Sequence, residues 1–235
     1  MVFLFILCAR SCNALQEDKD GILEDTSTPA KNSPTTTVLN PIPSEGIAYP
    51  LAISDDIVLE QIYTATGFFP EDGSDEAIEN VLAVKLTNTS SKMLEYLTFS
   101  LTVNGNVYSF SAATVPAGKS VYVFNSERKT SPDLVTVLEG NVEMELRFSE
   151  EPSTKPDVFS YDIQNGMVVV TNLSDKDIKS DIIVYYKSTV ENGYLGGITY
   201  RFRISGGLAA GKSFNAYAPH AYAHMTEIMF VQYEE

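Results

Sequence analysis

Two stretches of this chain share one order of landmarks, and this internal repeat constrains the fold more than any other feature. The stretches span residues 81–124 and 167–217. Each contains an alternating strand that ends in an asparagine (Asn88 or Asn172), then a second alternating strand, and then a closing turn with the sequence Ala-Gly-Lys-Ser. A repeat of this kind predicts tandem folding units, and therefore a presenting or binding surface more than an active site.

Short alternating strands and turn signals follow one another along most of the chain. Asn104-Gly105 and Asn165-Gly166 each separate two alternating runs, which predicts tight hairpins. Gly196-Gly197 interrupts a long strand over residues 194–204, where a bulge would fit. Helical periodicity is almost absent, although residues 216–225 could form a short helical turn. The pattern predicts an all-β fold of two tandem antiparallel Ig-like β-sandwich domains.

Composition divides the chain into four segments. We expect residues 1–14 to form a signal peptide or lipoprotein leader and residues 15–46, which are rich in Asp, Glu, Thr, Ser and Pro, to form a linker. Such a linker lacks the apolar period of a packed element, so we expect it to be disordered, either as a tether or as an unstructured leader. The first sandwich is expected over residues 47–150 and the second over residues 157–235. The segment between them contains two prolines.

The leader contains a short apolar run, Val2–Ala9. It is shorter than the roughly 20 residues that span a bilayer, but it has the length of a signal-peptide core. Cys12 could carry a lipid after lipoprotein cleavage, or ordinary cleavage could follow Ala14. We expect the protein to be exported and held at the cell surface by a membrane anchor; the alternative is a secreted protein. Signal peptides usually have basic residues before the apolar run, and lipoprotein cleavage sites rarely have an arginine where Arg10 lies. The alternative is therefore a cytosolic protein with an apolar N-terminus.

Charge and cysteine content narrow the classes of partner. The formal net charge is −15, which disfavours a nucleic-acid or anionic-membrane surface. We therefore expect no nucleic-acid partner, and membrane contact only through the N-terminal anchor. The two cysteines, Cys8 and Cys12, both lie in the leader, so the mature chain would have no internal disulfide.

The repeated motif resembles a known kind of module. It runs through a strand, Asn-x-Ser, a charged turn, an alternating strand, a hairpin and Ala-Gly-Lys-Ser, with Asn-x-Ser at Asn88–Ser90 and Asn172–Ser174. This order resembles the Ig-like, FxLYD-type domains of bacterial envelope proteins, and Tyr194–Arg201 looks like part of a domain of Firmicutes surface lipoproteins. The resemblance implies stalk or adaptor modules and brings no catalytic residues with it.

A tyrosine-rich hairpin is the candidate ligand site. Tyr185, Tyr186, Tyr194, Tyr200 and Arg201 are crowded into it. Alternation sends Tyr185 and Tyr186 to opposite faces, so at least one should be exposed. An exposed aromatic strip could stack on sugar rings or on peptide, although the absence of Trp weakens the sugar interpretation. Core and edge packing is the alternative.

Other polar clusters are weaker candidates. His220, His224 and Glu227 have the spacing of a zinc triad on a helix, but the H-E-x-x-H motif is absent, so we expect loop residues and no metal. The acidic loop at residues 71–76 lacks the spacing of a calcium loop, and we expect it to be solvated. The two Asn-x-Ser motifs match glycosylation acceptors, but their equivalent places predict that they cap turns.

These patterns favour a non-catalytic exported surface or envelope module that acts as a spacer or a protein-interaction domain. Its expected partner is an unknown envelope protein or polysaccharide, and no cofactor is expected. The alternative is a carbohydrate- or peptide-binding module that uses the tyrosine-rich hairpin. An enzyme is disfavoured, because the chain has no G-x-S-x-G motif, no phosphate-binding loop and no Cys-His pair after the leader.

Overall fold

The computed structural model describes residues 37–234, which form fourteen β-strands joined by turns and loops. This part of the chain contains no helix, so the predicted all-β class is confirmed. It likewise holds no helix that is long and apolar enough to cross a membrane. The predicted leader, Cys12 and most of the predicted linker lie outside the described residues.

The first half of the described chain, residues 38–147, contains eight strands in two sheets. They are β1 (Val38–Pro41), β2 (Leu51–Ala52), β3 (Ile57–Phe68), β4 (Ala77–Asn88), β5 (Leu94–Val103), β6 (Asn106–Val115), β7 (Ser120–Phe124) and β8 (Leu138–Arg147). The strand order is β1-β3-β4-β7 in one sheet, where β2 also pairs with β3, and β6-β5-β8 in the other. Side chains from both sheets, such as Leu82, Leu97 and Phe110, meet in one core.

The second half, residues 159–232, contains six strands. They are β9 (Phe159–Gln164), β10 (Met167–Asn172), β11 (Ile182–Val190), β12 (Gly193–Ile204), β13 (Ser213–Tyr217) and β14 (Thr226–Gln232). Their order is β9-β10-β13 in one layer and β12-β11-β14 in the other. In sequence order, this arrangement repeats β3-β4-β7 and β6-β5-β8 of the first half.

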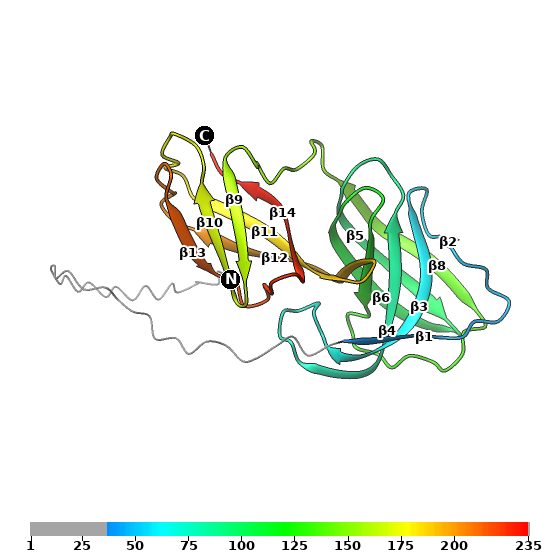
Figure 1. The fold of residues 1–235 in the computed structure, drawn as a ribbon. Helices are drawn as coiled ribbons and strands as arrows, with labels where there is room; N and C mark the ends of the chain where they lie inside the picture. The colour runs from blue at the N-terminus through cyan, green and yellow to red at the C-terminus, as the bar shows by residue number, and fades with distance from the viewer. Residues whose placement is uncertain (1–36, 235) are drawn as a thin grey trace, which may run out of the picture.

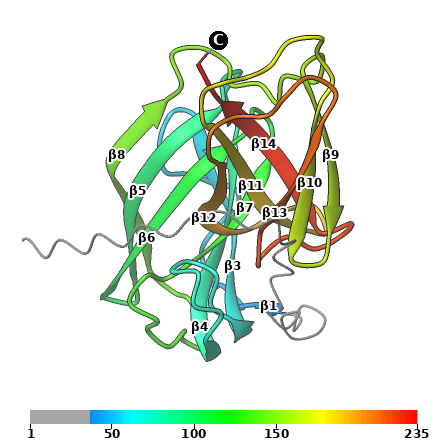
Figure 2. The same cartoon turned by 90° about the vertical axis from the view of Figure 1, so that its left-hand side faces the viewer.

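The two halves lie next to each other (Figure 1), and one sheet runs through both, with β7 and β12 labelled in Figure 2. β7 pairs in parallel with β12, with Val121 opposite Tyr194 and Tyr122 opposite Leu195. Among the named strands of the described chain, this is the one parallel pair, and it produces an eight-stranded sheet. The sequence predicts two purely antiparallel sandwiches and does not anticipate this connection.

The halves also share apolar packing. The core of the first half includes Tyr194, Met229 and Phe230, which come from β12 and β14 of the second half. Phe230 contacts Phe148 edge to face, with ring centroids 5.5 Å apart. Burying one large apolar side chain stabilises a fold by about 1.5–3 kcal/mol. Separating the halves would therefore expose part of the first core.

The first half begins earlier than the composition predicts. β1 pairs with β3 from Val38 opposite Thr66 to Pro41 opposite Tyr63, and Ile42 is buried in the first core. Residues 38–46, expected to be part of a disordered linker, therefore belong to the folded part of the chain. Ladder pairing with β3 and burial of the apolar Ile42 side chain both stabilise this segment, which its polar composition does not indicate.

The predictions for local turns agree with the structure more closely than the predicted linker boundary does. Asn104 and Gly105 have φ of 50° and 82°, and they close the hairpin between β5 and β6. The register between β11 and β12 shifts around Gly196-Gly197, which confirms the predicted bulge. The helical turn within residues 216–225 is not formed, since β13 extends to Tyr217 and turns follow it.

Candidate functional site

Three of the predicted ligand-binding tyrosines lie inside the protein. Tyr186, Tyr194 and Tyr200 are only 2%, 3% and 9% exposed. Tyr186 and Tyr200 stack on each other with centroids 5.5 Å apart, and the Tyr200 hydroxyl donates to the carbonyl of Pro70 at 3.4 Å. These rings pack against protein and offer no face to a ligand in solution.

The other two predicted residues are more accessible, but they do not form an aromatic platform. Tyr185 is half-buried, stacks on Phe230 at 4.2 Å, and donates its hydroxyl proton to Gln232 at 3.0 Å. Arg201 is exposed and lies opposite Tyr185 in the ladder. Tyr185 and Tyr186 do point to opposite faces, but the first packs against the core of the first half and the second packs into that of the second.

Lys187, next to Tyr186 in the sequence, lies in a buried polar site at the junction between the halves. Lys187 is completely buried. Its ammonium group donates to the carbonyl oxygens of Ala113 at 3.1 Å, Gly196 at 3.2 Å, Gly197 at 3.4 Å and Ile198 at 2.6 Å. Lys187 lies opposite the β12 bulge, so its charge satisfies carbonyls that the bulge removes from the strand ladder.

A carboxylate completes the junction from the first half. Glu71 lies in the loop between β3 and β4, and its Oε1 accepts a hydrogen bond from the N–H of Phe124 at 2.8 Å. Its Oε2 accepts one from the N–H of Gly197 at 2.7 Å. Phe124 ends β7 and Gly197 lies in the β12 bulge, so one carboxylate bridges the two strands next to their parallel pair.

Burial controls the electrostatics of this junction. Desolvation raises the pKa of the Glu71 carboxyl to about 7, although hydrogen bonds from Gly197 and Phe124 and the charge of Lys187 lower it. Desolvation also lowers the pKa of Lys187 to about 7, opposed by the negative charge of Glu71. Strongly shifted groups can mark an active site. Here each group is occupied by backbone partners, which favours a structural role.

Most of the acidic loop around Glu71 is exposed, as the sequence predicts, and its carboxylates also have protein partners. Asp72 and Glu76 both pair with Arg128, and Arg128 lies over the ring of Phe69 at 4.4 Å. Asp75 pairs with His220 of the second half at 3.2 Å. Within this loop, Glu71 and Asp75 contact the second half, whereas Asp72 and Glu76 pair within the first half.

The residues of the hypothetical zinc triad have separate partners. The ring of His220 stacks on Tyr200 at 4.3 Å, and Glu227 accepts a hydrogen bond from the Tyr194 hydroxyl at 3.1 Å. His224 lies in a turn with φ of 66°. Within residues 37–234, no group of three or more His, Cys, Asp or Glu side chains could hold a metal ion.

Glycine makes the close approach at the junction possible. A Cβ on Gly197 would lie 1.9 Å from the carbonyl oxygen of Ser111 in β6. Any larger residue would push β12 away from β6. In the sequence, Gly196-Gly197 indicated a bulge at this site. Lys187 did not indicate a buried site, because a lysine in an alternating strand normally faces solvent.

The two Asn-x-Ser motifs cap turns, as predicted. Asn88 is buried and donates its amide protons to the carbonyls of Lys92 at 2.9 Å and Val115 at 2.8 Å. Asn172 is also buried and donates to Lys176 at 2.8 Å and Leu208 at 3.0 Å. The two asparagines thus hold equivalent turns of the two halves.

Comparison with protein-family models, with curated proteins and with solved structures found no match for this chain. The resemblance to FxLYD-type modules therefore rests on the sequence motif, and functional inference rests on the geometry of the junction and the turns.

Proposed function

We propose that this protein is a non-catalytic module that holds two Ig-like β-sandwich units in one fixed orientation, as a spacer or protein-interaction part of an exported surface protein. The observation that carries the proposal is the sheet that runs through both halves. Two sandwiches joined only by a flexible linker would need neither a shared sheet nor a shared core.

The buried polar groups support the same proposal. Glu71 and Lys187 come from different halves, and each hydrogen-bonds to backbone groups of the other half. Burying a charged group is costly unless it is hydrogen-bonded, so these contacts favour one relative placement of the halves over others. A spacer or presenting module needs such a fixed placement.

A distance measurement between the halves tests the proposed rigidity. Spin labels would be attached at Glu143→Cys in β8 and Asp175→Cys in the second half, both exposed positions, with Cys8 and Cys12 changed to Ser. We expect one narrow distance distribution by double electron–electron resonance. A broad or bimodal distribution in the folded protein would contradict a rigid spacer.

The proposed surface location has a separate test. The intact mass of the mature protein from its native host would be measured in membrane and soluble fractions. A lipid-modified Cys12 in the membrane fraction supports a tethered surface module, and an unmodified N-terminus near Leu15 in the medium supports a secreted one. Retention of Met1 in the cytosol would overturn the proposed export.

A further inference from the structure

The equivalent asparagine turns differ in one respect: the first one holds an arginine side chain. Nη1 of Arg147 donates to Asn88 Oδ1 at 3.1 Å, to Ser90 Oγ at 2.6 Å and to the Lys92 carbonyl at 3.3 Å. Its Nη2 pairs with Glu145 and lies 3.5 Å from a carboxylate oxygen of Asp56. The first turn is thus a built guanidinium site, occupied by a residue of the same chain.

The second turn contains the equivalent oxygen atoms; Asn172 is buried, whereas Ser174 and Lys176 line a cavity. Ser174 Oγ donates to Asn172 Oδ1 at 2.7 Å and to the Lys176 carbonyl at 3.1 Å, as Ser90 Oγ does to Asn88 and Lys92 in the first half. Among the described residues, no arginine or lysine side chain donates to Asn172 Oδ1 or Ser174 Oγ.

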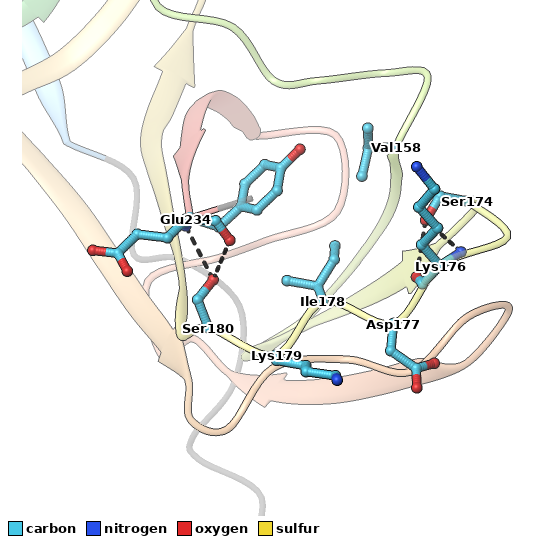
Figure 3. Close-up of a pocket in the computed structure, with 9 residues that line it drawn as sticks. Val158, Ser174, Lys176, Asp177, Ile178, Lys179, Ser180 and Glu234 are labelled. Atoms are coloured by element: carbon cyan, nitrogen blue, oxygen red, sulfur yellow. Dashed lines mark hydrogen bonds between the residues drawn. The ribbon is translucent and has the colours of Figure 1, made fainter.

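A cavity of about 650 Å³ lies beside this second turn (Figure 3). Ser174, Lys176 and Ile178 line one side of it, and Val158 and Glu234 contribute to the others. Figure 3 shows these side chains at the cavity, which Tyr233 also lines, and the hydrogen bonds between Ser180 and the backbone of Glu234.

Backbone contacts relate the surroundings of the cavity to those of Arg147. Leu173 N–H donates to the carbonyl of Val158, as Thr89 N–H donates to that of Asp56, so Val158 takes the position of Asp56.

The strand next to each turn gives the same correspondence. Ile178 bridges to Leu208 as Leu94 pairs with Val115, so Ile178 takes the position of Leu94. On its other side Leu94 pairs with Arg147 itself. In the described part of the chain, no strand pairs with Ile178 on that side.

We propose that this cavity binds the guanidinium group of an arginine side chain on an extended segment of a partner polypeptide. A planar guanidinium matches several oxygen acceptors at once, which a compact ammonium group does less well. The polypeptide source follows from the first half, where a paired strand, β8, carries the arginine. The proposal does not depend on the spacer role.

The charges near the cavity allow such a ligand to bind. Its rim contains Lys176 and Lys179 together with Asp177 and Glu234, so the formal charges balance locally. The chain as a whole carries −15, which attracts cationic partners over longer distances. In the first turn Lys92 lies at the position equivalent to Lys176, and there the carboxylates of Glu145 and Asp56 accompany the guanidinium.

The chain itself supplies the probe for a direct test. Residues 143–148 have the sequence Glu-Met-Glu-Leu-Arg-Phe and carry Arg147. An acetylated, amidated copy of this hexapeptide would be titrated into the full-length protein by NMR, beside a copy with citrulline in place of arginine. We expect shifts centred on residues 172–180 and at least tenfold weaker binding of the citrulline peptide. Equal binding of the two peptides, or shifts elsewhere, would overturn the proposal.

Two matched variants and one small probe complete the test. Ser174→Ala should weaken binding of the arginine peptide about tenfold, whereas Ser90→Ala should leave it unchanged, because Ser90 already holds Arg147. An unchanged affinity in Ser174→Ala would contradict the proposed site. Free arginine amide should bind much more weakly than the peptide, and equal binding would overturn the polypeptide part of the proposal. The comparison of the two peptides on the unmodified protein does not depend on the folding of any variant.

Discussion

The two halves use the same strand order, but equivalent strands have different environments. β7 in the first half and β13 in the second each follow an Ala-Gly-Lys-Ser turn. Phe124 of β7 is fully buried, since β7 lies between β4 and β12. The corresponding Tyr217 of β13 is 69% exposed, and β13 forms the edge of a three-stranded sheet. The same local pattern thus produces a central strand in one half and an edge strand in the other.

The loops that precede these strands differ as well. In the first half, the acidic loop between β3 and β4 supplies Glu71 and Asp75 to the junction. In the second half, the corresponding β9–β10 connection is the tight Asn165-Gly166 hairpin. The shared pattern therefore builds each sandwich, whereas residues that occur in one half alone join the two.

The largest expected effect comes from removing the buried ammonium group at the junction. Lys187→Met should lower the free energy of unfolding by about 3–5 kcal/mol, because four carbonyl oxygens lose their donor and Glu71 loses a compensating charge. Urea denaturation would measure the loss. The control is Lys119→Met, an exposed position in the turn before β7, which should change stability by no more than about 0.5 kcal/mol. Similar effects of the two changes would mean that the junction contributes little.

Adding a methyl group where β12 crosses β6 should cause the next largest loss of stability. Gly197→Ala places a Cβ against the carbonyl oxygen of Ser111, and the resulting backbone shift should cost about 3 kcal/mol. It should also broaden the distance distribution between the two spin labels. Gly118→Ala is the matched control: its φ is +69° with open space around it, so backbone strain alone should cost about 1–2 kcal/mol. A narrow distribution in Gly197→Ala would show that the crossing does not set the orientation.

Truncating the two capping asparagines compares the halves directly. Asn88→Ala and Asn172→Ala each remove the donor for two carbonyl oxygens, so each should destabilise the protein by about 2–3 kcal/mol. Asn88→Ala should cost about 1 kcal/mol more, since Asn88 also accepts a hydrogen bond from Arg147. Thermal and urea unfolding of both variants would measure the difference. A larger loss for Asn172→Ala would argue against an unoccupied guanidinium site in the second half.

The pH dependence of stability should show the smallest effect. The pKa of Glu71 is raised to about 7, so its contribution is complete below its ordinary value of 4.5 and is lost as the pH rises through about 7. The pKa of Lys187 is lowered to about 7, so its contribution is complete above its ordinary value of 10.5 and is lost as the pH falls through about 7.

The stability of the unmodified protein relative to the double variant Glu71→Gln/Lys187→Met should therefore be lowest near pH 7. Melting temperatures of both proteins at pH 5, 7 and 9 test this expectation. A difference that does not change with pH, or a maximum at pH 7, would contradict the assigned burial of the two charges.

Much of the local structure can be predicted from sequence. A period of two residues is visible in β5 and β9, and Asn104-Gly105 identifies a hairpin because both residues adopt positive φ. The capping role of Asn88 and Asn172 follows from their equivalent places before charged turns. These features depend on neighbours within a few residues, so a short stretch of sequence contains the necessary information.

The junction could not be predicted in this way. Glu71 and Gly197 are 126 positions apart, and their hydrogen bond depends on how two sheets meet. The tyrosine-rich hairpin illustrates the same limit: alternation correctly sends Tyr185 and Tyr186 to opposite faces, but it does not reveal that each face packs against a different half.

By itself, the sequence determined the all-β class, the hairpins, the bulge and the capped turns, because these follow from side-chain period and backbone preference. Only the tertiary structure decided which strands became central, where the buried charges lie, and which turn holds an arginine. A period of two residues shows which side chains share a face, but whether that face meets solvent or another layer depends on residues far away in the chain.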